Sequence, residues 1–199
     1  MLESLTKRIS LLWYYGIGAL GLRDEDIILT SFPKSGNTWI RFFLCNLLSL
    51  QEWSGKEITF PLLDKTMPEI GRSNLLEEWQ HETIPRIVKP HKQRLFFMQG
   101  CPSILLVRDP RDVMISYYSF DKGRVETSFD GSFSEFLRHP KKGIRGWVRH
   151  YQSWKPHADV VVRFEDLKED DVGTFDKMLS GIGLEVKIDL IKKAAKKST

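Results

Sequence analysis

Cysteine is scarce in this sequence. Its 199 residues include two cysteines, Cys45 and Cys101, and both lie among apolar neighbours. Free buried thiols are typical of such surroundings, whereas small secreted domains held by disulfides carry many more cysteines. The sequence therefore argues against a disulfide framework and favours a reducing compartment. We expect a cytoplasmic location mainly because the sequence contains no credible export or membrane signal.

Long apolar runs are also absent. The most apolar stretch covers residues 9–22, and its 14 residues fall short of the roughly 20 that a membrane-spanning helix needs. No small-residue cleavage site of a signal peptide follows it before the charged residues 23–26. We therefore predict that residues 1–25 form a helical segment packed on the domain, with no membrane partner. A helix tethered to a membrane through residues 9–22 is the alternative.

Basic residues are not gathered into a tract. The chain has 30 Lys and Arg against 26 Asp and Glu, which gives a formal net charge of +4. Because the basic residues are dispersed, we predict no nucleic-acid partner, and a small anionic ligand accounts for the excess charge. The sequence contains no recognisable metal-binding motif, so we predict no metal. No pattern in it predicts an oligomeric state.

Repeats, low-complexity segments and linkers are missing too, which predicts a single domain over residues 1–199. Apolar, β-branched runs instead alternate with helical patterns. Strands are predicted at residues 26–31, 86–89, 103–108 and 159–164, and helices at residues 37–50, 110–118 and 172–179. One more helix is predicted from the i, i+3, i+4, i+7 spacing of Trp147, His150, Tyr151 and Trp154.

This alternation is typical of an α/β protein. Helices then flank a central parallel sheet on both faces, in a three-layer arrangement like the P-loop fold. Ligands of such sheets bind beyond the carboxyl ends of the strands. The loops that follow Ser31, Lys89 and Arg108 are therefore the predicted ligand-binding loops.

The first of these loops has the parts of an anion-binding site. A strand end, a glycine turn, a lysine, hydroxyl groups and a helix N-terminus follow one another in SFPKSGNTW, residues 31–39. Backbone N–H groups and the helix dipole attract a phosphate, and Lys34 adds positive charge. The segment closely resembles the 5′-phosphosulfate loop of the sulfotransferase family that uses 3′-phosphoadenosine 5′-phosphosulfate (PAPS). The resemblance implies cofactor binding by Lys34, Ser35, Gly36, Asn37, Thr38 and Trp39.

A second segment resembles the family's 3′-phosphate-binding element. SILLVRDPRDVMISYYSF has an arginine at a predicted strand end and a serine eight residues later, which are Arg108 and Ser116. A guanidinium binds phosphate as a fork, and a hydroxyl donates one more hydrogen bond. The alternative is an ion pair of Arg108 with Asp109 or Asp112, with Ser116 as an ordinary helix residue.

Two further segments complete the resemblance. PRIVKPHKQ is similar to the family strand whose histidine is the catalytic base, which implies that role for His91. A single histidine is more often structural, and without the resemblance the other histidines would compete for the role. VVVRFEDLKED resembles the strand that ends in Tyr-Glu-Asp, with Phe164 in place of the tyrosine near the cofactor. After Phe164 nothing resembles the family's Arg-Lys-Gly loop, so we expect a shortened domain in which the cofactor-closing loop is not present.

The resemblance implies a sulfotransferase that passes the sulfuryl group of PAPS to a hydroxyl or amine of a small-molecule or carbohydrate acceptor. Adenosine 3′,5′-bisphosphate would leave, with His91 as base and Lys34 stabilising the leaving phosphate, and without a metal. One alternative is a non-catalytic nucleotide-binding remnant of the same fold. Another is a P-loop kinase, but a Walker loop has its lysine after the last glycine, whereas Lys34 precedes Gly36.

Overall fold

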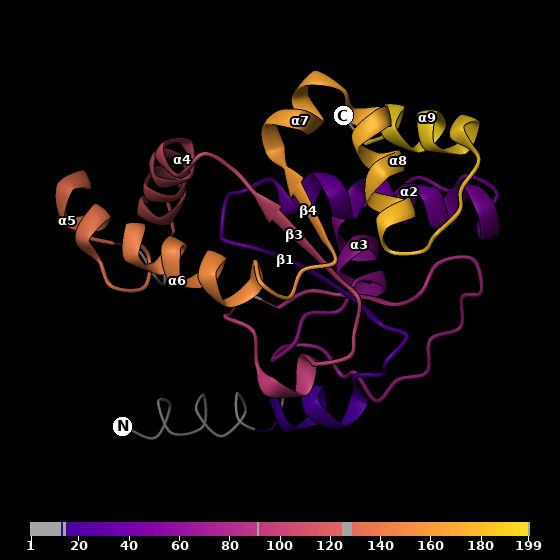
Figure 1. Cartoon of the computed structure of the whole chain (residues 1–199), viewed down its shortest axis with the longest axis horizontal. Helices are drawn as coiled ribbons and strands as arrows, with labels where there is room; N and C mark the ends of the chain where they lie inside the picture. The colour runs from indigo at the N-terminus through magenta and orange to yellow at the C-terminus, as the bar shows by residue number, and fades with distance from the viewer. Residues whose placement is uncertain (1–12, 14, 91, 125–128, 199) are drawn as a thin grey trace.

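A four-stranded parallel sheet lies at the centre of the protein (Figure 1). The computed structural model describes residues 13, 15–90, 92–124 and 129–198. The strand order is β2-β1-β3-β4. The strands are β1 (Ile27–Ser31), β2 (Ile87–Val88), β3 (Ser103–Val107) and β4 (Val160–Arg163). The predicted α/β fold with a parallel sheet is confirmed.

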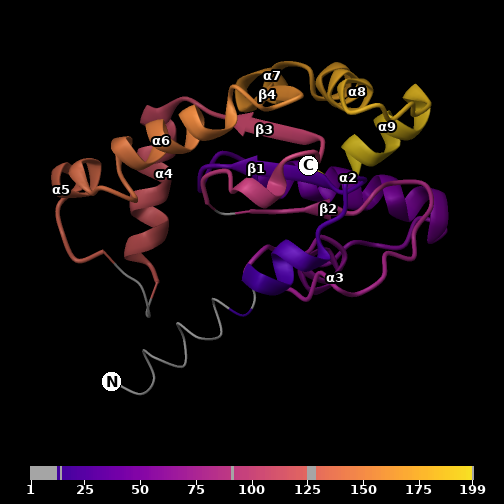
Figure 2. The same ribbon diagram turned by 60° about the horizontal axis from the view of Figure 1, so that its bottom comes forward.

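Helices cover both faces of the sheet because side chains alternate along its strands. Ile27 and Leu29 of β1 belong to one core, whereas Ile28 belongs to another on the opposite face. The first core includes α2 (Asn37–Glu52), α3 (Phe60–Thr66), α8 (Asp171–Gly181) and α9 (Ile188–Lys196). The second core includes α6 (Ile144–Trp154) and Tyr15 of the helical residues 15–21. Figure 2 shows the two sides of the sheet from a second direction.

A third, smaller core lies beyond the carboxyl end of β1. It contains Phe32 together with side chains of α4 (Pro110–Lys122) and α5 (Phe133–Arg138). Asp109 caps α4 by accepting a hydrogen bond from the backbone of Arg111, as expected for an aspartate before Pro110. This cluster fixes the direction of α4, which carries Ser116.

The predicted face of α6 is confirmed. His150 and Trp154 are buried, and Trp147 stacks on Tyr151 with ring centroids 5.5 Å apart. His150 also lies within hydrogen-bonding distance of the Thr30 hydroxyl of β1, at 3.1 Å. One side of α6 is thus attached to the sheet, which makes His150 a core residue.

Two predicted strands are shorter in the structure. The strand expected at residues 86–89 forms a ladder only over Ile87–Val88, although Lys89 makes an isolated bridge with Glu69. Pro90 has no backbone N–H and cannot extend the ladder. At the other edge, Phe164 begins α7 (Phe164–Glu169) and does not end β4. The short helices α3, α5 and η1 (Phe96–Met98) were not predicted, although Ser132 and Glu135 form a capping box before α5.

The prediction for the cysteines is confirmed. Cys45 and Cys101 are buried and form no disulfide with each other. Burial raises the pKa of both thiols to about 11, which keeps them protonated at neutral pH. They are therefore part of the cores and are poor nucleophiles.

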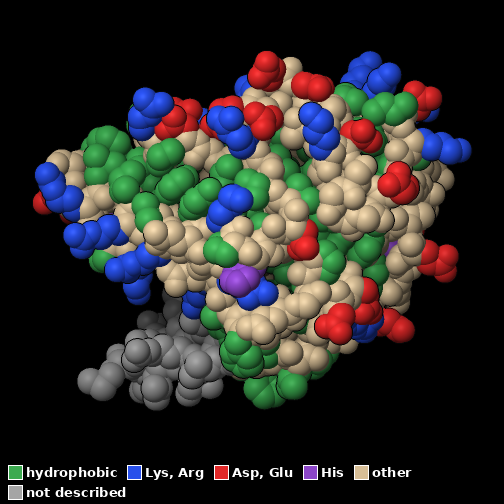
Figure 3. All heavy atoms as spheres, viewed as in Figure 1, with side chains coloured by type: hydrophobic (Ala, Val, Ile, Leu, Met, Phe, Trp, Pro, Cys, Tyr) green, Lys and Arg blue, Asp and Glu red, His purple; other side chains and the backbone are tan. Residues whose placement is uncertain are grey.

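The surface and the N-terminal segment give two further observations. On the face drawn in Figure 3, basic side chains gather at the end formed by α5 and α6. Among the residues of α5, α6 and the segment between them, Arg138, Lys141 and Arg145 are exposed. Near α7, acidic and basic side chains are mixed. Much of the predicted helical segment 1–25 lies outside the described residues. In the part of the chain that is described, every helix is too short or too polar to cross a membrane.

Candidate functional site

The loop between β1 and α2 is a tight turn that only one residue type fits at its key position. Gly36 has φ +100°, in the left-handed region. A Cβ atom on Gly36 would lie 2.4 Å from Cδ2 of the Phe164 ring. The neighbouring Lys34 also has a positive φ, 69°, and the backbone N–H of Ser35 donates to the carbonyl of Phe32 at 3.2 Å. Helix α2, with its first backbone N–H groups, therefore begins directly after a compact turn.

This loop lies at the point where the order of the strands reverses. From β1 the chain continues to β2 on one side and then to β3 on the other side. In open α/β sheets the ligand crevice lies outside the carboxyl ends of the strands at such a point. The loop after Ser31 and the residue after Val107 lie at this crevice.

Arg108 follows β3 and reaches the loop. Its Nη1 donates to the carbonyl of Lys34 at 3.4 Å, and its guanidinium lies 4.4 Å from the ring centroid of Phe164. The ion pair with Asp112 considered above is present at 3.5 Å, but the Asp112 side chain is 58% exposed. Asp109 instead accepts hydrogen bonds from Arg111, which lower the pKa of Asp109 to about 2. Arg108 thus keeps much of its hydrogen-bonding capacity.

A cavity of about 800 Å³ joins the predicted residues. We call it the loop cavity. Eight of the predicted residues line it, namely Lys34, Gly36, Asn37, Thr38, Trp39, Arg108, Ser116 and Phe164. Ser35 is fully buried beneath the loop and does not line the cavity. His91 lies outside the described residues.

Several buried donors at this site have no partner. Five buried side-chain polar atoms in the described part of the chain lack a hydrogen bond, and all five belong to the loop, the first turns of α2 or Arg108. They are Ser35 Oγ, Asn37 Nδ2, Trp39 Nε1, Arg41 Nε and Arg108 Nε. Buried polar groups are normally hydrogen-bonded, so their concentration in one place indicates a site built for a ligand with several acceptor atoms.

The cavity also contains basic residues that the sequence analysis missed. Arg41, Arg72, Lys89 and Arg124 line it together with Lys34 and Arg108, and none of its described lining residues is acidic. Such a wall favours an anionic ligand. Arg41 could have been noticed as a charged residue within the apolar helix 37–50, because arginine is rarely buried without a partner.

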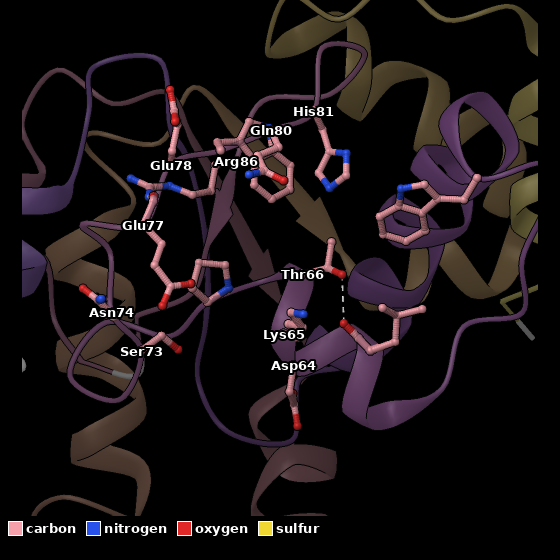
Figure 4. Close-up of a pocket in the computed structure, with 14 residues that line it drawn as sticks. Asp64, Lys65, Thr66, Ser73, Asn74, Glu77, Glu78, Gln80, His81 and Arg86 are labelled. Atoms are coloured by element: carbon pink, nitrogen blue, oxygen red, sulfur yellow. Dashed lines mark hydrogen bonds between the residues drawn. The ribbon is translucent and has the colours of Figure 1, made fainter.

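A second large cavity lies away from the loop. It has a volume of about 620 Å³ and lies between α3 and the segment 73–81. Figure 4 shows Ser73, Asn74 and Glu77 on one side and α3, with Asp64, on the other. We call this cavity the outer groove. No predicted site residue lines it.

The alternative of a P-loop kinase would need a metal ion at the phosphates. Among residues 13, 15–90, 92–124 and 129–198, no three His, Cys, Asp or Glu side chains are grouped so that they could hold a metal ion. Basic side chains are the charged groups among the described residues that line the loop cavity.

Comparisons with known proteins identify one family. Residues 24–199 match the family described as the sulfotransferase domain. Sulfotransferase 1B1 of Canis lupus familiaris is 29% identical over 165 residues, which cover 74% of this chain and 55% of the relative. The chain thus spans little more than half the length of that relative.

Solved structures show the same fold. Mouse sulfotransferase SULT7A1, complexed with PAP, has a TM-score of 0.66 and 20% identity, and the match covers 89% of this chain and 66% of the other. Retinol dehydratase, in complex with androsterone and the inactive cofactor PAP, has a TM-score of 0.64 and 17% identity, with 89% and 65% covered.

Proposed function

We propose that this chain, which belongs to the sulfotransferase domain family, binds PAPS and transfers its sulfuryl group to an acceptor hydroxyl or amine. The observation that carries the proposal is a group of unpartnered buried donors around a cavity whose walls are basic, namely those of Ser35, Asn37, Trp39 and Arg108. The two solved structures of similar fold are complexes with PAP, which is adenosine 3′,5′-bisphosphate, the nucleotide product of such a transfer. A small-molecule or carbohydrate acceptor would approach from the open side of the cavity.

We assign separate groups of the chain to the 5′-phosphosulfate and the 3′-phosphate of the nucleotide. The first N–H groups of α2, with Lys34 and Thr38, would bind the 5′-phosphosulfate, since a helix N-terminus attracts an anion. Arg108 and Ser116 line the same cavity and would bind the 3′-phosphate through a guanidinium fork and a hydroxyl.

Aromatic side chains lie between these groups. Trp39 and Phe164 have ring centroids 6.0 Å apart with an interplanar angle of 74°, and both line the loop cavity. We assign them to the adenine, whose flat π-surface suits aromatic contacts. Phe164 also supports Arg108 through the cation–π contact, so one ring would order both the base site and the phosphate site.

The residues of the chain have distinct tasks in the transfer. When bound, PAPS would supply the sulfuryl group: the acceptor oxygen or nitrogen would bond to its sulfur, the bond from sulfur to the bridging oxygen would break, and adenosine 3′,5′-bisphosphate would keep the electron pair. His91 would accept the acceptor's proton, an assignment that rests on the sequence resemblance alone. Lys34 would neutralise charge on the leaving phosphate. Its Nζ lies 4.3 Å from the ring centroid of Phe120 in the wall of the same cavity.

Calorimetric titration with adenosine 3′,5′-bisphosphate tests this proposal. We expect saturable binding that weakens at least about tenfold in Arg108→Ala and in Lys34→Ala, because each loses a charged hydrogen-bond donor. Arg145→Ala removes an exposed arginine of α6 and is the matched control. No binding, or equal binding of ATP, would contradict the proposal.

A turnover assay separates the enzyme from the non-catalytic alternative. PAPS labelled with ³⁵S and a panel of phenols, alcohols, amines and sugars should yield a labelled acceptor. Binding of the bisphosphate with no labelled product across the panel would favour a nucleotide-binding remnant of the fold.

A further inference from the structure

A smaller cavity opens beside the loop cavity. It has a volume of about 270 Å³, and it shares Arg41, Arg72 and Lys89 with the loop cavity. We call it the side cavity. Its lining residues are Arg41, Asp64, Met67, Glu69, Arg72, Ser73 and Lys89. Lys34 and Arg108, which we assign to the nucleotide, do not line it.

Arg41 is the centre of this cavity. The residue is only 6% exposed, and its Nη2 donates to Asp64 at 2.8 Å and more weakly to the carbonyls of Leu63 and Met67. Its Nε is buried and has no partner. The Asp64 side chain is 69% exposed, so its charge is strongly screened by water. A buried guanidinium with a free donor and a weak counter-ion lacks the full pairing that a buried charge normally has.

Lys89 and Arg72 lie opposite one shared carboxylate. Glu69 lies 3.0 Å from Nζ of Lys89 and 3.3 Å from Nε of Arg72. The backbone bridge between Glu69 and Lys89 fixes this pair beside the end of β2. Three basic side chains therefore face two carboxylates, and the side cavity has one excess positive charge.

We propose that the side cavity binds a carboxylate of the acceptor, so that the substrate class is a hydroxylated or amino compound with an acidic group near the reacting atom. Arg41 is the main ligand of that carboxylate, because its Nε–H is free and the planar fork of Nε and Nη2 would suit two oxygen atoms once the exposed Asp64 carboxylate moves aside. At about 30 Å³ for each water in the liquid, the side cavity has the volume of about nine waters, which is room for a carboxylate and the few atoms attached to it. This inference rests on the proposed function.

The outer groove extends the same path. Asp64 and Ser73 line both the side cavity and the outer groove. In Figure 4 the side chains of Asn74 and Gln80 lie along this groove and can hydrogen-bond hydroxyl groups. An acceptor longer than the side cavity would therefore continue past Arg41 into a polar groove.

Two pairs of small-molecule probes test the proposal and distinguish a sugar from a phenol as the acceptor. Glucuronate and glucuronamide represent a sugar, and 4-hydroxybenzoate and 4-hydroxybenzamide represent a phenol; each pair differs in a carboxylate against a neutral amide. The readout is the ¹⁵N–¹H signal of Arg41 Nε, assigned by its loss in Arg41→Gln. We expect a saturable shift with at least one acid and binding about tenfold weaker for its amide.

Variants make the result specific. Acid binding by the variants is measured by calorimetry, because neither carries the Arg41 signal. Arg41→Gln should weaken binding of the acid about tenfold, and Arg41→Lys, which keeps the charge without the fork, should weaken it less. Arg145→Gln on α6 should have no effect. Equal binding of acid and amide, or unchanged acid binding in Arg41→Gln and Arg41→Lys, would overturn the proposal.

Titration with the nucleotide shows whether the carboxylate site or the proposed function has failed. Adenosine 3′,5′-bisphosphate should bind together with the acid and leave the Arg41 shift in place. Displacement of the acid by the bisphosphate would overturn a separate acceptor site. Acid binding at Arg41 without any binding of the bisphosphate would overturn the proposed function and leave the carboxylate site established.

Discussion

Replacement of Gly36 by alanine tests whether the loop between β1 and α2 excludes a side chain at this position. The substitution has two costs. A non-glycine residue in the left-handed region costs about 1–2 kcal/mol. The new Cβ would also lie 2.4 Å and 2.7 Å from two atoms of the Phe164 ring, so the ring or the loop must move.

Gly183 separates these two costs. It also has a positive φ, 77°, but nothing lies within 4 Å of a Cβ placed there. Gly183→Ala should therefore lower the free energy of unfolding by the backbone cost alone. Gly36→Ala should lower it by about 1–3 kcal/mol more, within the range of overpacking substitutions. Urea unfolding of both variants measures the difference.

Nucleotide binding gives the second readout. A shift of the Phe164 ring disturbs the cation–π contact with Arg108, so Gly36→Ala should bind adenosine 3′,5′-bisphosphate less tightly. In Gly36→Ala/Phe164→Leu the smaller side chain should restore part of the lost stability. Equal destabilisation by Gly36→Ala and Gly183→Ala, with no recovery in the double variant, would refute the reasoning.

Two further predictions concern stability. Asp26→Asn should lower the free energy of unfolding in urea by about 3–5 kcal/mol, because it leaves the buried guanidinium of Arg86 without a counter-ion. In the wild type the Asp26 carboxylate lies 2.6 Å from Nη2 of Arg86. Substitution of the exposed neighbour, Glu25→Gln, is the control, and a similar cost in both variants would contradict this prediction. Burial alone raises the pKa of Glu52, but hydrogen bonds, chiefly from Thr83, outweigh it and lower the pKa from 4.5 to about 2. The ionised carboxylate therefore stabilises the fold above pH 4.5, and this contribution is lost as the pH falls towards 2, so the wild type should lose more stability than Glu52→Gln between about pH 5 and about pH 3.

The central sheet could be predicted because its signals are local. Each strand is a short apolar run followed at once by a loop or a helix cap, as at Asp109 and Pro110, and neighbouring residues alone produce this pattern. The edges were less predictable. Residues 86–89 and 159–164 read as full strands, but an edge strand has one partner fewer, and the chain leaves the sheet at Pro90 and Phe164.

The sequence by itself determined the loop that we propose for anion binding, because strand, turn and helix N-terminus are adjacent in residues 31–39. It also indicated Arg108 at the end of a strand. The tertiary structure alone decided what surrounds them. Phe164 comes from the far edge of the sheet to cover Gly36 and support Arg108, and no local pattern links these positions.

The side cavity is the clearest case of this division. Arg41 lies on a helix, Lys89 follows an edge strand, and Arg72 lies in a loop. In the sequence they are three separate basic residues among 30 Lys and Arg. Only the parallel pairing of β1 with β2, and the packing of α3 against α2, bring their charges to one wall, because electrostatic interactions depend on distance in space and not on separation along the chain.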